Sequence, residues 1–283
     1  MPAIAHRTVT VDGLHLFVRQ AGNPDRPTIA LLPGYPSSTR AYIRLIDRLA
    51  RNWHTVAIDY PGFGSSDPLP DSPTFDRLAE VTAKAIDVLG IGDYVMYMFD
   101  FGAPVGFRIA LDHDQRVLGI VTQNANAYVE GFGPGVAALS GWWADRAGGQ
   151  ATIDGFVSLA GTQMQWQAGA RDPEHIDPEQ ALADQLVLDL PGRADYMKAL
   201  LWDYQNNPPR YDAWQAWLRR RQPTVLAIWG KNDPFFIPPG AEAYARDAKA
   251  TTVVLLDTGH FALEEEADTI SDRIDQLMTD TFV

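Results

Sequence analysis

Short apolar segments alternate with segments of helical periodicity along most of this chain. Residues 8–11 and 14–19 alternate apolar and polar positions on either side of Asp12-Gly13, which predicts a β-hairpin with a two-residue turn. Further strands are predicted at 28–32, 56–58, 94–99, 117–122, 224–229 and 252–256. Helices with an apolar face are predicted between the strands and again near 240–250 and 264–278. This alternation predicts an α/β fold with a mostly parallel, doubly wound sheet.

The alternation fails between residues 126 and 222, where helical periodicity continues without strands. We therefore predict a core domain of residues 1–126 and 223–283, with residues 127–222 forming a helical cap inserted after the sixth strand. Six of the eight tryptophans lie in the predicted cap: Trp142, Trp143, Trp166, Trp202, Trp214 and Trp217. They suit the roof of an apolar pocket, although packing of the cap on the core explains most of them equally well.

Composition narrows the range of partners. The chain has 283 residues, is 46% hydrophobic and carries a formal net charge of -13, with no dense basic patch. Such a charge argues against nucleic acid or an anionic membrane, so we expect a small, neutral, apolar substrate. The sequence has no cysteine, no signal-peptide pattern and no apolar stretch that would span a bilayer, which makes a cytoplasmic location the default expectation. We expect no metal or cofactor, and either a monomer or a homodimer.

An acidic residue stands at the centre of the predicted fold. Asp100 lies between the apolar run at 94–99 and a helix that begins near Gly102. A charged side chain at that junction costs desolvation energy, and the junction matches a nucleophile elbow, the sharp strand-to-helix turn that presents a catalytic side chain. The alternative is that Asp100 only caps the helix, since aspartate is a favoured N-cap residue.

Two further polar residues follow predicted strands. Asp233 comes shortly after the strand at 224–229, and His260 after the strand at 252–256. Ligands of open α/β sheets bind beyond the carboxyl ends of the strands, where these side chains are expected to meet Asp100. Nucleophile, acid and histidine, in that chain order, are the triad of α/β-hydrolases.

On these residues the chain resembles the α/β-hydrolase superfamily, and within it the branch with an aspartate nucleophile, which contains epoxide hydrolases and haloalkane dehalogenases. The matching segments are Pro33-Gly34-Tyr35-Pro36, 59–66 (DYPGFGSS), 99–106 (FDFGAPVG), 230–234 (GKNDP) and Gly259-His260-Phe261. Pro33 replaces the usual histidine, and Phe101 replaces the tryptophan common after the nucleophile. The resemblance implies that the backbone N–H groups of Phe101 and Tyr35 form an oxyanion hole.

An aspartate nucleophile selects the reaction on chemical grounds. A carboxylate is already ionised at neutral pH, so it needs no base to activate it. Its attack on a saturated carbon bearing a leaving oxygen or halide gives an alkyl ester on Asp100. His260, oriented by Asp233, would then activate water to hydrolyse that ester. The expected substrate is therefore an epoxide or an alkyl halide.

The leaving group separates these alternatives. An epoxide calls for a proton donor to the ring oxygen, and Tyr204 lies where the resemblance places such a cap tyrosine. Pro36, Trp166, Tyr128 and Tyr211 are further candidates for the substrate pocket. A haloalkane dehalogenase that uses Trp166 or another cap indole for the halide is the nearest alternative. A binding protein that keeps the fold without turnover is a second alternative.

Overall fold

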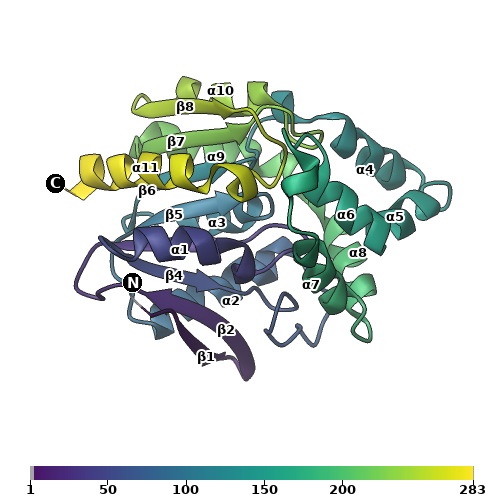
Figure 1. The fold of residues 1–283 in the computed structure, drawn as a ribbon, viewed down its shortest axis with the longest axis horizontal. Coiled ribbons are helices and arrows are strands. Elements are labelled where there is room, and N and C mark those ends of the chain that lie inside the picture. Colours follow the sequence, from purple (N-terminus) through teal and green to yellow (C-terminus); the bar gives the residue numbers. More distant parts are fainter. Residues whose placement is uncertain (1–2, 283) are drawn as a thin grey trace.

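A computed structural model describes residues 3–282 (Figure 1), and its centre is one eight-stranded sheet. The strand order is β1-β2-β4-β3-β5-β6-β7-β8. The strands are β1 (Ala5–Val11), β2 (Leu14–Ala21), β3 (Thr28–Leu32), β4 (His54–Ile58), β5 (Tyr94–Phe99), β6 (Val117–Gln123), β7 (Thr224–Gly230) and β8 (Thr251–Leu256). All eight predicted strands are confirmed, with ends that shift by at most a few residues.

The N-terminal hairpin is the antiparallel edge of the sheet. β1 pairs with β2 through Asp12 and Gly13, which both have positive φ angles (51° and 84°), as the tight hairpin turn requires. β2 then pairs antiparallel with β4, and every later pairing is parallel. β3, β4 and β5 are buried at every position, which explains their continuous apolar sequence.

Helices cover both faces of the sheet and enclose two apolar cores (Figure 1). One core contains residues of α1 (Ile43–Leu49) and α11 (Leu263–Phe282). The other contains residues of α2 (Phe75–Val88), α3 (Gly102–Asp112), α9 (Tyr211–Arg221) and α10 (Pro238–Asp247). The fold is thus the doubly wound α/β architecture expected from the sequence.

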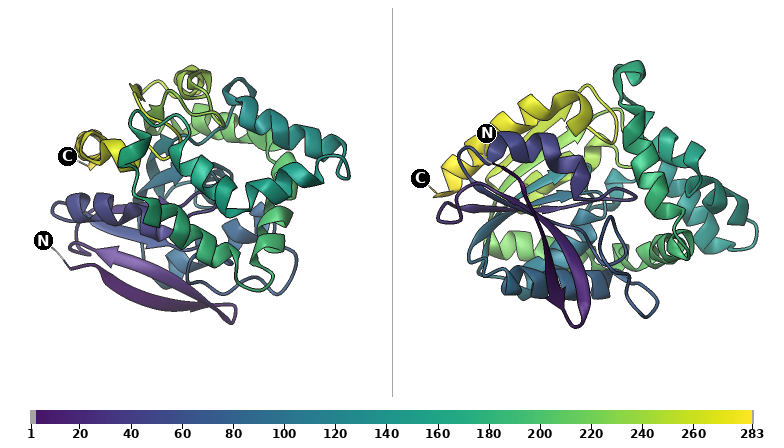
Figure 2. Two further views of the ribbon diagram at one scale, coloured as in Figure 1. Left: turned by 45° about the vertical axis from the view of Figure 1, so that its right-hand side comes forward. Right: turned by 60° about the horizontal axis from the view of Figure 1, so that its bottom comes forward.

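Further helices lie beyond the ends of the parallel strands, on the side to which their arrowheads point (Figures 1 and 2). They are α4 (Pro134–Ala144), α5 (Gln150–Phe156), α6 (Leu159–Gln167), α7 (Pro178–Leu188) and α8 (Arg193–Asp203), all between β6 and β7. The last helix of the insertion, α9, packs instead on α3 and α10, with the ring of Trp214 stacked 5.2 Å from that of Phe107. By its contacts α9 therefore lies with the helices of the core, although the expected cap boundary follows it.

Within residues 3–282, every helix is too short or too polar to cross a bilayer.

Candidate active site

Asp100 occupies a strained turn between β5 and α3. Its φ angle is +50°, a conformation that a residue with a side chain rarely adopts. The turn fits only because its neighbours are small: a Cβ on Gly34 would lie 2.5 Å from the Cβ of Asp100, and one on Gly102 would lie 2.8 Å from the carbonyl oxygen of Leu32. The N-cap residue of α3 is Phe101, not Asp100, so the helix-cap alternative is wrong. The strain and the close packing are those of a nucleophile elbow.

The two oxygens of the Asp100 carboxylate have different surroundings. Oδ1 accepts a hydrogen bond of 2.7 Å from the backbone N–H of Tyr35. The backbone N–H of Phe101 also interacts favourably with the carboxylate, and both N–H groups lower its pKa. Oδ2 faces the Nε2 atom of His260 at 3.6 Å, which is beyond a direct hydrogen bond. Oδ1 is thus held by the N–H of Tyr35, while Oδ2 faces the histidine.

His260 and Asp233 form a buried, hydrogen-bonded pair. The Nδ1 atom of His260 lies 2.7 Å from Oδ2 of Asp233, so Nδ1 carries the proton and Nε2 points toward Asp100. Oδ1 of Asp233 accepts a bond of 2.7 Å from the backbone N–H of Phe235. Burial lowers the pKa of His260, but the charges of Asp233 and Asp100 and the hydrogen bond to Asp233 outweigh burial and leave that pKa raised. The structure thus brings the three predicted triad side chains together.

Asn124 holds the acid in place, a role that our sequence analysis did not identify. Its Nδ2 donates to Oδ2 of Asp233 at 2.7 Å, and its Oδ1 accepts from the backbone N–H of Gly230 at 2.9 Å. The residue adopts a positive φ angle of 45°, which asparagine tolerates better than most side chains. Asn124 follows β6 as Asp233 follows β7, so the rule that located the acid would also have located Asn124.

Burial dominates the titration of Asp100. Desolvation raises the pKa of this carboxyl to about 6, against the opposing effects of the His260 charge and the two backbone N–H groups. The same burial, with the Asp100 charge adding to it, raises the pKa of the Tyr35 phenol. At neutral pH Asp100 is still mostly ionised. A pKa of about 6 places its titration in a pH range that activity measurements cover.

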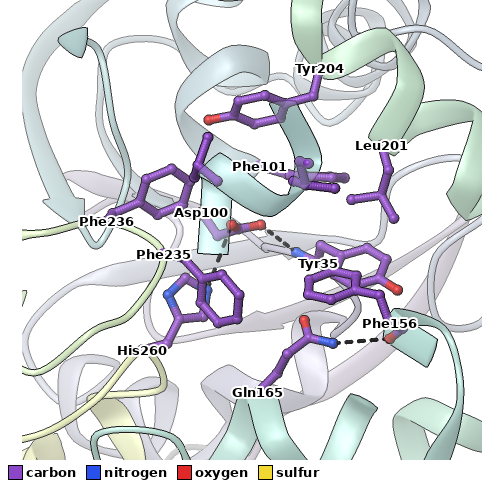
Figure 3. Close-up of a pocket in the computed structure, with 12 residues that line it drawn as sticks. Tyr35, Asp100, Phe101, Phe156, Gln165, Leu201, Tyr204, Phe235, Phe236 and His260 are labelled. Atoms are coloured by element: carbon purple, nitrogen blue, oxygen red, sulfur yellow. Dashed lines mark hydrogen bonds and ion pairs between the residues drawn. The ribbon is translucent and has the colours of Figure 1, made fainter. Parts of the chain in front are cut away.

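A small enclosed cavity lies above the Asp100 carboxylate (Figure 3). Its volume is about 30 Å³, enough for one or two water molecules, so a substrate must displace part of the wall. The lining residues are Tyr35, Asp100, Phe101, Val136, Leu139, Phe156, Gln165, Leu201, Tyr204, Phe235, Phe236 and His260. Most are apolar or aromatic, as a site for an apolar ligand requires.

Tyr204 lies on the opposite side of the cavity from His260 and Gln165, above Asp100 (Figure 3). It begins the short 3-10 helix η4 (Tyr204–Asn206), and its ring packs beside those of Phe101 (5.8 Å) and Trp143 (6.1 Å). Burial raises the pKa of its phenol well above the usual value, and Tyr211 and Asp100 add to this shift. Tyr204 is therefore protonated at neutral pH and lines the cavity, so its predicted role as proton donor stays a prediction.

Trp166 does not line the cavity. Its indole N–H donates to Oδ2 of Asp184 at 2.9 Å, and its ring stacks on Phe261 with the ring centroids 3.7 Å apart. The side chain therefore fastens α6 to α7 and to the loop after β8. The expectation that Trp166 contacts the substrate is not met in this geometry, because its only donor is already bonded.

Three other pocket candidates also lie outside the cavity lining. The hydroxyl of Tyr128 donates to Oδ2 of Asp247 at 2.8 Å, away from the site. Tyr211 is buried in α9, with its ring 5.0 Å from that of Trp214, and its hydroxyl interacts with that of Tyr204, which does line the cavity. Pro36 is buried and follows Tyr35 through a cis peptide bond. The aromatic residues that do line the cavity include Phe156, Phe235 and Phe236, none of which the sequence analysis singled out.

An open groove of about 250 Å³ adjoins the cavity. The groove lies among α4, α5 and α6, and it shares Leu139, Phe156 and Phe235 with the cavity. Phe156 is only half-buried, and its ring stacks on Tyr35 at 5.3 Å. These three side chains thus lie between the groove and the cavity.

Comparison with known proteins agrees with this architecture. Residues 27–267 match the family model described as the alpha/beta hydrolase fold, so the chain belongs to that family and is a hydrolase of that fold. It is 38% identical over 275 residues to an uncharacterised hydrolase of Saccharomyces cerevisiae, with 95% of both chains covered. It is 21% identical over 293 residues to epoxide hydrolase 2 of Caenorhabditis elegans, covering 97% of this chain and 80% of the relative.

Among solved structures, Cfl2 of Burkholderia cenocepacia superposes with a TM-score of 0.81. The alignment covers 96% of this chain and 95% of Cfl2, with 24% sequence identity. At that identity the likeness shows the fold and leaves the substrate to be argued from the site itself.

Proposed function

We propose that this hydrolase opens epoxides to vicinal diols through a covalent ester on Asp100. The observation that carries the proposal is that the two oxygens of the Asp100 carboxylate have different partners. Oδ1 is held by the backbone N–H of Tyr35 at 2.7 Å, and Oδ2 faces both the cavity side of the site and Nε2 of His260. A carboxylate held in this way is arranged to attack with one oxygen while the other remains bound.

In the first step Oδ2 of Asp100 attacks a carbon of the epoxide ring, and the carbon–oxygen bond of the ring breaks. The departing oxygen takes a proton from the phenol of Tyr204, which lies across the cavity. Burial makes this phenol a weaker acid than usual. The departing alkoxide is desolvated in the same cavity, so burial raises its basicity as well, and the transfer still runs toward the substrate.

In the second step His260 takes a proton from water, and the resulting hydroxide attacks Cγ of the Asp100 ester. Oδ1 then carries the developing negative charge, and the N–H groups of Tyr35 and Phe101 stabilise it as an oxyanion hole. The intermediate collapses with return of the proton from His260 to the departing diol oxygen. The proton that remains on the Asp100 carboxyl group then restores the Tyr204 phenol, which gave up its own proton in the first step. Formation of the neutral ester removes one of the charges that raise the pKa of His260, which favours the neutral base when it is needed.

The composition of the cavity favours an epoxide over an alkyl halide. Among the residues that the structure describes, no tryptophan lines the cavity, and the indole N–H of Trp166 is bonded to Asp184. Phe101 offers no side-chain donor at the position after the nucleophile. A leaving halide would therefore lack the indole donors of a dehalogenase, whereas a leaving alkoxide faces the phenol of Tyr204.

A single turnover in heavy-oxygen water tests the covalent step. We expect the label in Asp100, because water attacks the carbonyl carbon of the ester and not the substrate. His260→Gln should accumulate the ester as a mass increase of the intact protein. Label found only in the diol under single-turnover conditions would refute the ester mechanism. Absence of both diol and halide from a panel of epoxides and haloalkanes would favour the alternative of a binding protein.

Tyr204→Phe tests the proton donor. Loss of the hydroxyl should slow ester formation from an epoxide by roughly 100-fold to 10,000-fold and spare ester hydrolysis. Tyr60→Phe is the matched control, because the Tyr60 hydroxyl is buried without a hydrogen-bond partner and Tyr60 does not line the cavity. Unchanged epoxide alkylation in Tyr204→Phe would remove this residue from the mechanism. Brisk halide release by the wild type without diol formation would favour the dehalogenase.

A further inference from the structure

One polar side chain in the cavity wall has no part in the proposed reaction. Gln165 of α6 is 2% exposed, lines the cavity, and is surrounded mainly by apolar and aromatic groups. Its Nε2 lies 3.4 Å from the carbonyl oxygen of Phe156 and 3.2 Å from that of Gly161. Both partners can only accept hydrogen bonds, so the amide nitrogen must face them.

The amide oxygen of Gln165 therefore faces the cavity. Figure 3 shows Oε1 directed into the space between the rings of Phe156 and Phe235, while Nε2 points to the Phe156 carbonyl. Within residues 3–282 no donor bonds to this oxygen. Because this oxygen is accessible from the cavity, a water or a ligand in the cavity can supply the donor.

A second polar atom without a partner belongs to Tyr35, which also lines the cavity. The hydroxyl of Tyr35 is buried and has no hydrogen-bond partner, while the Tyr35 ring stacks on Phe156. Phe156 thus contacts Tyr35 with its ring and Gln165 with its carbonyl. Tyr204 lies across the cavity from both groups (Figure 3). The cavity thus has a phenol above Asp100 and the amide oxygen of Gln165 on its far side. The Tyr35 hydroxyl is buried in the wall, and a ligand reaches it only by displacing part of that wall.

We propose that Gln165 and Tyr35 bind a hydroxyl group carried by the substrate at the end remote from the epoxide ring. A hydroxyl both donates and accepts, so it can donate to Oε1 of Gln165 and accept from the hydroxyl of Tyr35. This inference rests on the proposed epoxide opening for its substrate class. It replaces a purely apolar substrate by an apolar chain with one hydroxyl, and it makes Gln165 a residue that determines specificity.

Orientation of the hydrolytic water is the competing explanation for Gln165. That role would account for the free amide oxygen but leaves the unpartnered hydroxyl of Tyr35 unexplained. The two explanations differ in what they affect. A substrate anchor changes binding and the discrimination between substrates, whereas a water-orienting group changes the decay of the ester for every substrate alike.

The test measures recognition with and without chemistry. Binding is measured for hexan-1-ol and for its ether isomer 1-methoxypentane, which keeps the oxygen but cannot donate. Turnover is measured for an epoxyhexanol with a terminal hydroxyl and for an epoxyheptane of equal size. The variants are Gln165→Met and Tyr35→Phe, with Gln163→Met as the matched control, since Gln163 is an exposed residue of the same helix.

We expect the wild type and Gln163→Met to prefer the alcohol and the hydroxylated epoxide by roughly tenfold to a hundredfold, and Gln165→Met to abolish the preference. Tyr35→Phe should reduce the same preference. Because this substitution breaks no intramolecular hydrogen bond, it still tests the hydroxyl-binding role if Gln165→Met fails to fold. An alcohol preference that depends on Gln165 in a protein that opens no epoxide would refute the reaction and leave this inference standing.

Two outcomes would overturn the inference. The first is a wild type that binds the alcohol no better than the ether, or a preference that survives in both variants. The second is a Gln165→Met variant with unchanged binding and an equally slowed ester decay for both epoxides, which would assign Gln165 to the water.

Discussion

Lowering the pH below 7 should slow ester formation, because burial raises the pKa of Asp100 to about 6. With that pKa about 91% of the carboxyl groups are ionised at pH 7 and about 9% at pH 5, a tenfold loss of the nucleophile. With the ordinary aspartate value of 3.8, about 94% would remain ionised at pH 5 and the rate would hardly change. The rate of ester formation at pH 5 therefore distinguishes the raised pKa from the ordinary one.

The assay is the rate of ester formation in a single turnover, followed between pH 4.5 and 8 by rapid quenching and intact-protein mass spectrometry. Circular dichroism at each pH checks that the protein remains folded. We expect the rate to rise with a midpoint near 6. In His260→Gln the midpoint should move upward, because the charge of His260 lowers the pKa of Asp100. A midpoint near 4, or a midpoint that moves downward in His260→Gln, would refute this electrostatic reasoning.

Three further predictions follow from the same contacts. Asp100 has a raised pKa in the folded state, so its ionisation removes stability as the pH rises between about 4 and 6. Asp100→Asn should therefore add on the order of 3 kcal/mol at pH 7 and nothing below pH 4, measured by urea unfolding. Asn124→Ala leaves Oδ2 of Asp233 short of a donor, and should cost about 1–3 kcal/mol and slow ester hydrolysis more than ester formation in pre-steady-state kinetics. Phe156→Ala joins the cavity to the groove, and kcat/KM should then rise by about threefold to fourfold for each methylene that reaches the groove; equal chain-length profiles for variant and wild type would count against this role of Phe156.

The sequence by itself determined the sheet, its order of elements and the three residues that follow its strands. Short apolar runs such as Tyr94–Phe99 between turn residues favour buried strands, and the carboxyl ends of parallel strands meet at one edge. Asp100, Asp233 and His260 therefore had to converge, whatever the side-chain details. Asn124 also follows a parallel strand, but its side chain is uncharged, so the search for charged groups after strands did not identify it.

The cap was decided by tertiary structure. Its helices show little amphipathic contrast, so periodicity says that they are helices but not which face each turns to the cavity. Trp166 and Gln165 are adjacent in α6, yet the indole bonds to Asp184 while the amide lines the cavity. Which of the two side chains faces the cavity depends on how α6 packs against α7 and the loop after β8, and these segments are far apart in the chain.

The electrostatics of the site also arose only in the folded protein. Nothing in the local sequence of Asp100 raises its pKa, because the cause is desolvation by aromatic groups that reach it from several elements, among them Phe235 and Tyr204. The amide oxygen of Gln165 likewise faces the cavity only because the amide nitrogen donates to two backbone carbonyls, those of Phe156 and Gly161. Local patterns determine which residues follow which strand, while burial and hydrogen-bond partners are properties of the whole fold.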